Sequence, residues 1–177
     1  LMDPADLDSL PQRPHVIFMA GTKFGSSGDP AGTWAVNCYL PGRVAEHFRD
    51  SRLVAFSTGN VYPLVTPESG GCAETDPPGP VGEYAQSCLG RERVLTYFSR
   101  SNRTPACILR LNYAVEARYG VLLDIGRKVF EGRPVPLRMG CVNVIWQGDA
   151  NSICLRAFSL CDVPASVLNL TGPEILA

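Results

Sequence analysis

Three side chains near the middle of the chain have types and spacings that suit proton-transfer chemistry. Thr58 follows an apolar run, Tyr84 lies 26 residues later at the start of an amphipathic stretch, and Cys88 lies four residues beyond Tyr84. In a helix, residues four apart share one face and lie one turn apart. A phenol can take up or release the proton of a neighbouring hydroxyl, but its ordinary pKa near 10 leaves only about one molecule in a thousand ionised at pH 7. A positive charge nearby would correct that mismatch, and Cys88 carries none.

The cysteines give no sign of a nucleophile or a metal site. No histidine lies near Cys88 in the sequence to activate its thiol, so a buried packing role is the simpler interpretation. The seven cysteines include no Cys-x-x-Cys pair, and only His15 and His47 could join them at a metal. We therefore expect no metal and no disulfide framework. Cysteines within apolar runs such as 106–109 indicate a reducing compartment, so we expect a cytoplasmic protein.

The charge balance argues against two classes of partner. The chain of 177 residues has 16 basic and 17 acidic residues without a run of like charge, so it lacks the electrostatic footprint of a nucleic-acid-binding protein. No run of 18 uncharged apolar residues occurs, so we expect no membrane partner. A nearly neutral chain of this length suits one domain that binds a small molecule.

Short apolar runs alternate with longer amphipathic stretches along the chain. The runs are typical of strands buried on both faces, and the stretches are typical of helices because their apolar residues lie three and four apart. The expected strands are 15–20, 53–57, 106–111, 142–146 and 167–170, and the expected helices are 34–49, 81–101, 120–131 and 148–160. Pro41 is expected to kink or divide the first helix, and 66–80 to form a long loop. The alternation predicts a doubly wound α/β fold with a parallel sheet.

A glycine-rich segment, 21–28, follows the first expected strand and could be read as a phosphate-binding turn. The N–H groups of such a turn face a pyrophosphate when a helix begins at the last glycine. Here 29–33 intervene before the expected helix, and no acidic residue ends the next strand to hold a ribose. We therefore interpret the segment as a loop that lines a cleft, and we expect no dinucleotide fingerprint in this chain.

Two segments carry a resemblance to a known family. Residues 56–62, FSTGNVY, close the second expected strand, and residues 83–92, EYAQSCLGRE, begin the second expected helix. They resemble the extended short-chain dehydrogenase/reductases, the NAD-dependent epimerases and dehydratases. In that family a Ser-Ser/Thr-x-x-Val-Tyr-Gly strand end precedes a Tyr-x-x-x-Lys helix that has Glu four residues after the lysine. Further matches are Asn37, 108–112, 132–135 and Asp149, so the resemblance covers residues 14–172.

The resemblance implies a Rossmann-like doubly wound parallel sheet that is incomplete at both ends. The whole chain, 1–177, would be a partial NAD(P)-binding epimerase/dehydratase domain without the N-terminal glycine-rich loop and the C-terminal lobe of the family. The cofactor implied for the longer parent is NAD or NADP, with weak or absent binding by this chain alone. The partners implied are a small-molecule substrate and a second copy, in a homodimer that pairs through helices 34–49 and 81–101.

The resemblance also assigns roles to individual residues. Tyr84 would be the acid/base, Thr58 would hydrogen-bond the substrate oxygen, and Cys88 takes the place of the lysine in this catalytic set. The implied cofactor residues are Ala20, Gly21, Ser57, Tyr84, Leu111 and Asn112, and the implied substrate residues are Asn60, Asn112 and Arg118. The implied activity is NAD(P)-dependent epimerisation, dehydration or reduction of a nucleotide sugar or a related hydroxyl or carbonyl compound, without a metal.

Cys88 is the main departure from the family pattern, because a neutral thiol supplies neither positive charge nor strong hydrogen bonds to a ribose. Lys23 and Arg91 are cations that could replace the lysine, although we expect Arg91 to point away from the Tyr84 face of its helix. Two alternatives to the enzyme follow. One is a non-catalytic nucleotide-binding or regulatory protein on the same fold, and the other is a subunit that serves only assembly.

Structural roles remain open for several matched residues. Tyr84 by itself would be an ordinary half-buried helix tyrosine. Asn37 could bond only to backbone, Asn112 could cap a turn, and Asp149 could be a first-turn residue favoured by the helix dipole.

Overall fold

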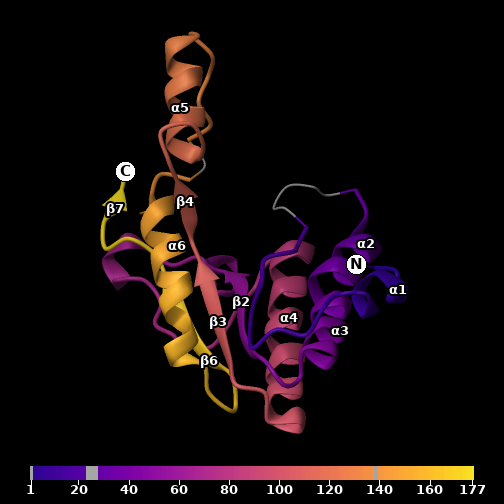
Figure 1. Ribbon diagram of the computed structural model, residues 1–177. Helices are drawn as coiled ribbons and strands as arrows, with labels where there is room; N and C mark the ends of the chain where they lie inside the picture. Colours follow the sequence, from indigo (N-terminus) through magenta and orange to yellow (C-terminus); the bar gives the residue numbers. More distant parts are fainter. Residues whose placement is uncertain (1, 23–27, 138) are drawn as a thin grey trace.

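The computed structural model describes residues 2–22, 28–137 and 139–177, and its centre is a four-stranded parallel sheet. The strands are β1 (His15–Phe18), β2 (Arg52–Thr58), β3 (Ala106–Leu111) and β6 (Ser166–Leu170), in the order β1-β2-β3-β6 (Figure 1). All three pairings are parallel. The predicted α/β class with a parallel sheet is therefore confirmed.

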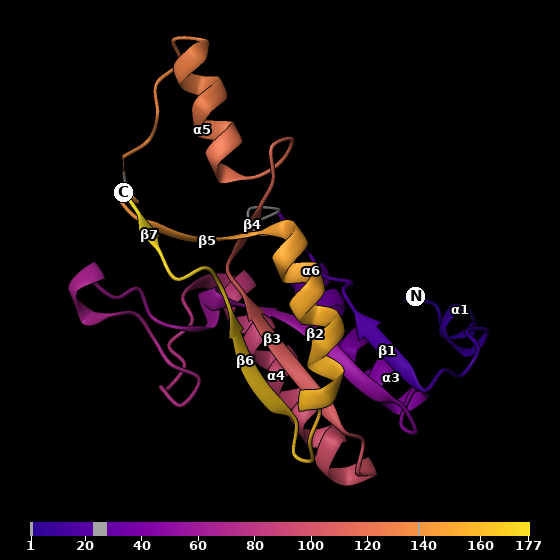
Figure 2. The same cartoon turned by 60° about the vertical axis from the view of Figure 1, so that its left-hand side comes forward.

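Helices cover both faces of this sheet (Figures 1 and 2). One face carries α2 (Pro30–Trp34), the π-helical turn η1 (Ala35–Tyr39), α3 (Leu40–His47) and α4 (Gly82–Asn102), and the short α1 (Pro4–Asp8) contacts α3. The other face carries α6 (Gln147–Arg156), which continues into the 3-10 turn η4 (Ala157–Leu160). The predicted helices 81–101 and 148–160 are thus confirmed to within one residue at each end.

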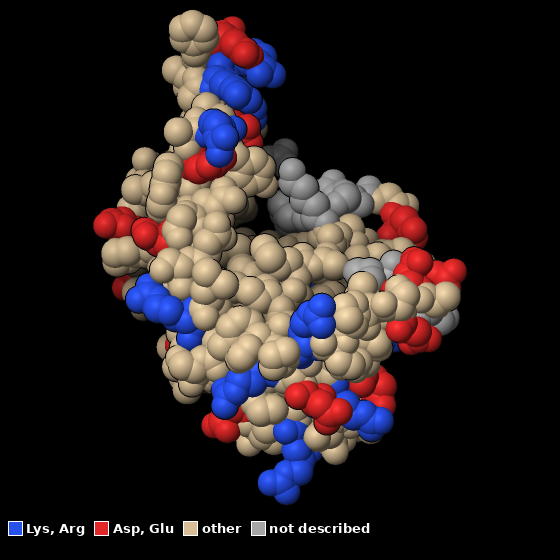
Figure 3. Space-filling model, viewed as in Figure 1, with Lys and Arg blue, Asp and Glu red and all other residues tan. Residues whose placement is uncertain are grey.

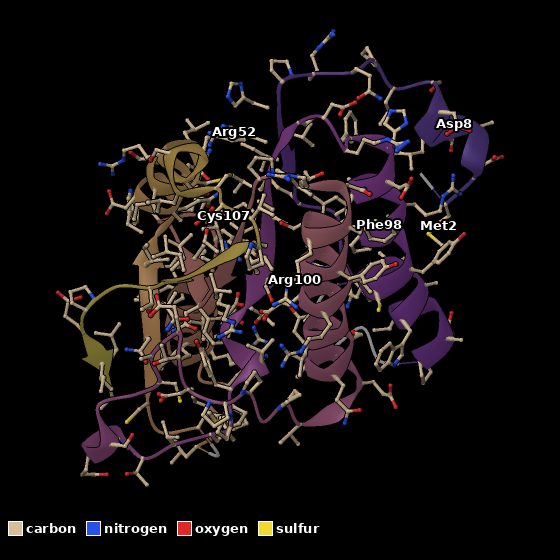
Figure 4. The ribbon with its side chains drawn as sticks, turned by 90° about the horizontal axis from the view of Figure 1, so that it is seen from below. Met2, Asp8, Arg52, Phe98, Arg100 and Cys107 are labelled. Carbon is tan, nitrogen blue, oxygen red and sulfur yellow. The ribbon has the colours of Figure 1, made fainter. Side chains whose placement is uncertain are left out.

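Alternating residues of the central strands pack into two different hydrophobic layers, because successive side chains of a strand point to opposite faces. Leu53 of β2 belongs to the layer that includes Leu95 of α4, whereas its neighbour Val54 belongs to the layer that includes Cys154 of α6. Figure 4 shows Cys107 of β3 on the α6 side of the sheet. Each layer is buried only because helices cover it, which is why these strands are continuously apolar.

The first long helical segment begins earlier than the sequence suggested. It starts at Pro30, and the Asp29 side chain accepts a hydrogen bond of 2.9 Å from the Gly32 N–H. An acidic N-cap followed by proline at the first position is a strong helix start. The expectation that 29–33 are non-helical was therefore wrong. Residues 23–27 of the glycine-rich segment, including Lys23, lie outside the described residues.

Pro41 divides this segment by a change of helix type and not by a loop. Residues Ala35–Tyr39 form a π-helical turn in which the Leu40 N–H reaches the Ala35 carbonyl. Pro41 has no N–H to offer to the carbonyl of Asn37 four residues earlier. That carbonyl instead accepts a hydrogen bond of 3.1 Å from Nε of Arg91.

A second, smaller sheet continues from the carboxyl end of β3. It contains β4 (Tyr113–Val115), β5 (Val142–Trp146) and β7 (Ile175–Leu176), with β4 parallel and β7 antiparallel to β5. The predicted strand 142–146 is confirmed, but it pairs here and not in the main sheet. Between β4 and β5, the predicted helix 120–131 appears as α5 (Val121–Phe130), which extends away from the main sheet in both ribbon views (Figures 1 and 2).

A long connection joins β2 to α4 and contains the predicted loop 66–80. It includes two 3-10 turns, η2 (Gly59–Val61) and η3 (Pro67–Ser69). Asn169 of the edge strand β6 fastens it: the backbone N–H donates to Glu74 Oε1 at 2.7 Å, and Nδ2 donates to the Cys72 carbonyl at 3.0 Å. The loop therefore covers the outer edge of β6.

Three further observations concern the described residues alone. No helix among them is both long and apolar enough to cross a bilayer. No cluster of three or more His, Cys, Asp or Glu side chains in the described ranges could hold a metal ion. All seven cysteines are free thiols.

Candidate active site

A cavity of about 440 Å³ lies where the carboxyl ends of β2 and β3 meet the base of α5. Thr58 and Leu111 pair in register at those strand ends, so the sequence positions that follow them converge. Ligands of open α/β sheets bind at this edge. The lining residues are Ser57, Thr58, Asn60, Tyr84, Leu111, Asn112, Tyr113, Ala114, Tyr119, Gly120, Val121 and Asp124. Figure 3 shows a hollowed and largely uncharged surface below α5.

Thr58 and Tyr84 meet in this cavity, although 26 residues separate them in the sequence. Thr58 ends β2, and its Oγ1 accepts a hydrogen bond of 3.2 Å from the Asn60 N–H, which fixes the side chain at the start of η2. Tyr84 lies in the first turn of α4. Both side chains line the cavity, so the structure brings these two predicted residues together.

Burial raises the pKa of Tyr84 to about 12, because the phenolate would lose its solvation. The neighbouring Cys88 adds to the rise, whereas the hydrogen bond with Thr58 and the positive charge of Arg91 oppose it. Without a ligand, Tyr84 is therefore a neutral phenol at pH 7. It can donate a proton, but its conjugate base needs a further source of stabilisation.

Cys88 lies behind the cavity and not in its wall. Its side chain is 2% exposed, and burial raises the pKa of its thiol. Nδ2 of Asn37 lies 3.9 Å from the Cys88 sulfur and donates to Oγ of Ser87 at 3.0 Å. These contacts support the packing interpretation of Cys88 that the sequence favoured over a nucleophile.

Arg91 lies on the same face of α4 as Tyr84 and Cys88, so the expectation that it points away was wrong. Residues seven apart are separated by two turns of helix and share a face. Its guanidinium is buried, and Nη1 and Nη2 donate to the Phe56 carbonyl at 2.7 Å and to Asn37 Oδ1 at 2.9 Å. Sequence reasoning named Arg91 as a possible replacement cation but misjudged its orientation, although the i, i+4, i+7 spacing already indicated a shared face.

Ser57 is turned inward by a buried network. Its Oγ donates to Glu92 Oε1 at 2.6 Å, and Glu92 is also held by Arg110, whose Nη2 lies 2.7 Å from Oε2. Nη1 of Arg110 reaches the Tyr62 hydroxyl at 2.5 Å, and that hydroxyl donates to Asn169 Oδ1 at 2.9 Å. The wall of the cavity is thus rigidly connected to β3, to β6 and to the loop after β2.

Asn112 lines the other side of the cavity, and Gly59 lies against its side-chain amide. Nδ2 of Asn112 donates to Thr171 Oγ1 at 3.0 Å, and its backbone N–H donates to the Leu170 carbonyl. A Cβ at Gly59 would collide with the Asn112 amide, so a larger residue there would have to displace that side chain. Asn112 therefore links the cavity wall to β6 and does more than cap a turn.

Besides Cys88, three predicted site residues lie outside the cavity wall. Ala20 packs against the hydrophobic layer under α3 and α4. Gly21 lies beside Arg91, because a Cβ at Gly21 would be 2.7 Å from Nη2. Arg118 is largely exposed and forms an ion pair of 3.1 Å with Glu116.

Two polar wall residues, Tyr113 and Asp124, were not predicted as site residues. They come from β4 and the first turn of α5. The tyrosine beside Asn112 was a usable signal, because polar residues that follow a strand end lie at the ligand-binding edge.

Comparisons with known proteins agree with this geometry. The family model described as "NAD dependent epimerase/dehydratase family" matches residues 1–120, which is more than half of the chain. A search of curated protein sequences found no match.

Several solved structures share the fold. RMD from Pseudomonas aeruginosa complexed with NADPH has a TM-score of 0.82 at 18% identity, with 99% of this chain and 67% of that chain covered. A double mutant of the dTDP-glucose 4,6-dehydratase DesIV from Streptomyces venezuelae with NAD and DAU bound scores 0.84 at 18% identity, covering 99% and 57%. UDP-glucuronic acid 4-epimerase from Bacillus cereus in complex with NAD scores 0.79 at 18% identity, covering 92% and 55%. The chain thus spans between 55% and 67% of the length of these three proteins.

Proposed function

Since the chain belongs to the NAD-dependent epimerase/dehydratase family, we propose that it forms the acid/base half of an NAD(P)-dependent epimerase, dehydratase or reductase. The observation that carries the proposal is that Thr58 and Tyr84 line one cavity at the carboxyl ends of parallel strands. A phenol and a hydroxyl at this edge are the groups that a proton transfer at a substrate oxygen requires.

The substrate class that we propose is a nucleotide sugar or a related hydroxyl or carbonyl compound. Structures with the same fold include a dTDP-glucose 4,6-dehydratase and a UDP-glucuronic acid 4-epimerase, which supports this choice. Asn60 and Asn112 line the cavity and can hydrogen-bond sugar hydroxyls. We propose that Arg118 binds a more distant group of the substrate, such as a phosphate, because its exposed side chain lies at the turn before α5.

The described residues fit one end of a dinucleotide cofactor. When bound, the cofactor supplies hydride transfer to or from a substrate carbon. Thr58, Tyr84, Leu111 and Asn112 offer hydroxyls, an amide and an apolar contact for the nicotinamide end. Ser57 contributes wall surface, but its hydroxyl is committed to Glu92. No glycine-rich turn from strand directly into helix occurs within the described ranges to hold the diphosphate.

The proposed mechanism assigns the proton to Tyr84. As an acid, the phenol donates its proton to the substrate oxygen, so the Oη–H bond breaks and a new O–H bond forms on the substrate. As a base, the phenolate takes the proton back. Thr58 hydrogen-bonds the same region and favours the phenolate, which the direction of its effect on the pKa of Tyr84 supports.

The second candidate is a non-catalytic nucleotide-binding or regulatory protein on the same fold. The buried thiol of Cys88 and the pKa of about 12 for Tyr84 favour this reading, because both describe a site that does not ionise readily. The two candidates differ in turnover and not in binding.

A proposed cytoplasmic homodimer completes the description. An apolar groove of about 690 Å³ runs along the outer side of α3 and α4 and includes Trp34, Val94 and Phe98. Figure 4 shows Phe98 between these helices. This groove supports pairing through the two helices, and sedimentation of the purified protein measures it directly.

The test of function combines a binding and a turnover experiment. NADH and NADPH are titrated by fluorescence into this chain and into the longer protein that contains it, and nucleotide sugars are then screened for turnover. Tyr84→Phe should abolish turnover and still bind the cofactor, with affinity reduced only by the loss of one hydroxyl contact. Tyr97→Phe, an exposed tyrosine on the same helix, is the matched control and should have no effect.

The outcomes separate the two candidates. Cofactor binding with turnover supports the enzyme, and binding without turnover on any sugar nucleotide supports the regulatory protein. Full turnover in Tyr84→Phe would remove the acid/base role of Tyr84.

A further inference from the structure

Arg91 is a buried cation that forms no ion pair with a carboxylate of the described residues. Its side chain is 5% exposed, and its three hydrogen bonds go to the Phe56 carbonyl and to the carbonyl and side-chain oxygens of Asn37. All three acceptors are neutral. Among the described residues, the ion pairs of the chain are formed by Arg110, Arg118 and Arg133. Burying a charge without an opposite charge is costly, so such a group needs an explanation in function.

The surroundings of Arg91 hold it at the ligand-binding edge of the sheet. Its guanidinium carbon lies 5.6 Å from the centre of the Phe18 ring at the end of β1. Nη2 lies next to Gly21, where a Cβ would leave only 2.7 Å between them. Phe56, which accepts from Nη1, lies near the end of β2. The cation is therefore fixed between the carboxyl ends of two strands and has no freedom to swing into solvent.

The side-chain amide of Asn37 connects this cation to the face of Tyr84. Its Oδ1 accepts from Arg91 Nη2 at 2.9 Å, while its Nδ2 lies 3.9 Å from the Cys88 sulfur. Tyr84, Cys88 and Arg91 follow one another at spacings of four and three residues, so they form one stripe on α4. The Asn37 amide thus lies between the Arg91 guanidinium and Cys88, the residue one helical turn after Tyr84.

We propose that Arg91 is the cation of this site, and that its charge stabilises the Tyr84 phenolate that forms when the phenol gives its proton to a substrate oxygen. The inference rests on the proposed acid/base role of Tyr84 and names a cation that offsets part of the cost of the phenolate in the absence of a lysine at position 88. Arg91 acts through the field of its charge and does not touch the substrate, so it is a positioning residue.

The other charged groups around the site leave this role to Arg91. Glu92, the next residue on α4, is already neutralised by Arg110. Cys38 of η1 and Cys88 of α4 are thiols whose pKa values are raised by burial, so both are neutral at pH 7. Asp124 of α5 lies in the cavity wall and supplies no positive charge. Of the described residues at this site, Arg91 is the one whose charge opposes the desolvation of Tyr84.

The test is a titration of the phenol at position 84 alone. The residue is replaced by 3-fluorotyrosine, whose phenol is more acidic than that of tyrosine, and its fluorine NMR shift is followed against pH without substrate or cofactor. Arg91→Met and Arg91→Gln remove the charge and should each raise the pKa at position 84. Arg91→Lys keeps the charge and should change it much less. Two neutral variants are made so that the test can still be done if only one of them folds.

A charge-relocation variant separates electrostatics from packing. Cys88→Lys combined with Arg91→Gln moves the positive charge one turn along α4 and should return the pKa at position 84 to the range of the unmodified site. Arg93→Met, which removes an exposed arginine from the same helix, is the control and should leave the titration unchanged. Circular dichroism confirms that each variant is folded.

An unchanged titration in the folded neutral variants would overturn the proposal, as would an equal shift in Arg91→Lys. Because the titration needs no substrate or cofactor, its result is independent of the proposed function. A protein that turns over no sugar nucleotide but shows the expected shifts would lose the enzyme assignment and keep the cation assignment.

Discussion

The guanidinium of Arg110 and the carboxylate of Glu92 form a buried ion pair, with Nη2 2.7 Å from Oε2 and Nε 3.0 Å from Oε1. The pair joins β3 to α4 beneath the cavity. Glu92 also accepts a hydrogen bond from Ser57, and Arg110 also donates one to the Tyr62 hydroxyl, so both charged groups have a further hydrogen-bond partner. Such a pair fixes the relative position of the strand end and the helix that carry the candidate acid/base.

We expect Glu92→Gln to destabilise the fold by about 3–5 kcal/mol, because it leaves the Arg110 charge buried without compensation. The free energy of unfolding from denaturant titration measures this change. Glu131→Gln is the control, since its ion pair with Arg133 is about half exposed and should contribute less than about 1 kcal/mol. Equal effects of the two substitutions would show that burial does not govern the strength of the pair.

Tyr84 should make stability depend on alkaline pH. Its pKa of about 12 in the folded protein exceeds the ordinary value of 10.0, so the folded state holds this proton more tightly than the unfolded state. The stabilisation is fully present below pH 10.0 and is lost as the pH rises towards 12, and it amounts to about 2–3 kcal/mol.

Denaturant unfolding of the wild type and Tyr84→Phe, measured at several pH values from neutral to strongly alkaline, tests this dependence. The phenylalanine variant should lose less stability over the upper part of that range. Cys161, whose pKa burial raises to about 11, is present in both proteins and cancels in the comparison. Parallel curves for the two proteins would contradict the raised pKa.

We expect Gly59→Ala to cost about 1–3 kcal/mol, because the added methyl group collides with the Asn112 amide and disturbs its hydrogen bond to Thr171. Thermal unfolding measures the cost. Gly140→Ala is the matched control, since a Cβ there meets nothing within 4 Å, and should lie within about 0.5 kcal/mol of the wild type. A neutral Gly59→Ala would mean that Asn112 moves aside without loss.

Asn169 should control the order of the loop between β2 and α4. Asn169→Ala removes the side-chain bonds to the Cys72 carbonyl and the Tyr62 hydroxyl, although the backbone bond to Glu74 remains. We expect faster hydrogen exchange across 70–80 with little change in the sheet. Asn102→Ala, at the end of α4, serves as the control for loss of an asparagine amide. Unchanged exchange in the loop would show that the backbone bond alone holds it.

The strands of the main sheet could be predicted from the sequence because each is a continuous apolar run that two helical layers must cover. Val54 and Cys107 illustrate this, since they are buried beneath α6 while their neighbours face α3 and α4. The meeting of Thr58 and Tyr84 was predictable too, because strand ends and helix starts of a parallel sheet lie at one edge.

Other features depended on contacts that no local pattern reveals. The two-residue strand β7 exists because Val142 and Asn143 of β5 pair with it, and its sequence has no strand periodicity of its own. The inward turn of Ser57 follows from a distant Glu92 and is invisible in the 56–62 motif. Arg91 is different, because its spacing from Tyr84 did predict a shared face, and the error lay in the interpretation of that spacing.

The missing N–H of Pro41 couples three positions that are far apart in the chain. Because proline cannot donate a helical hydrogen bond to the Asn37 carbonyl, that oxygen is free to accept a hydrogen bond from Nε of Arg91. A residue with an N–H at position 41 would compete for the same oxygen. In a set of relatives, proline at 41, asparagine at 37 and arginine at 91 should therefore be gained or lost together. The π-helical turn before α3 should then occur in those relatives that bury an arginine on α4.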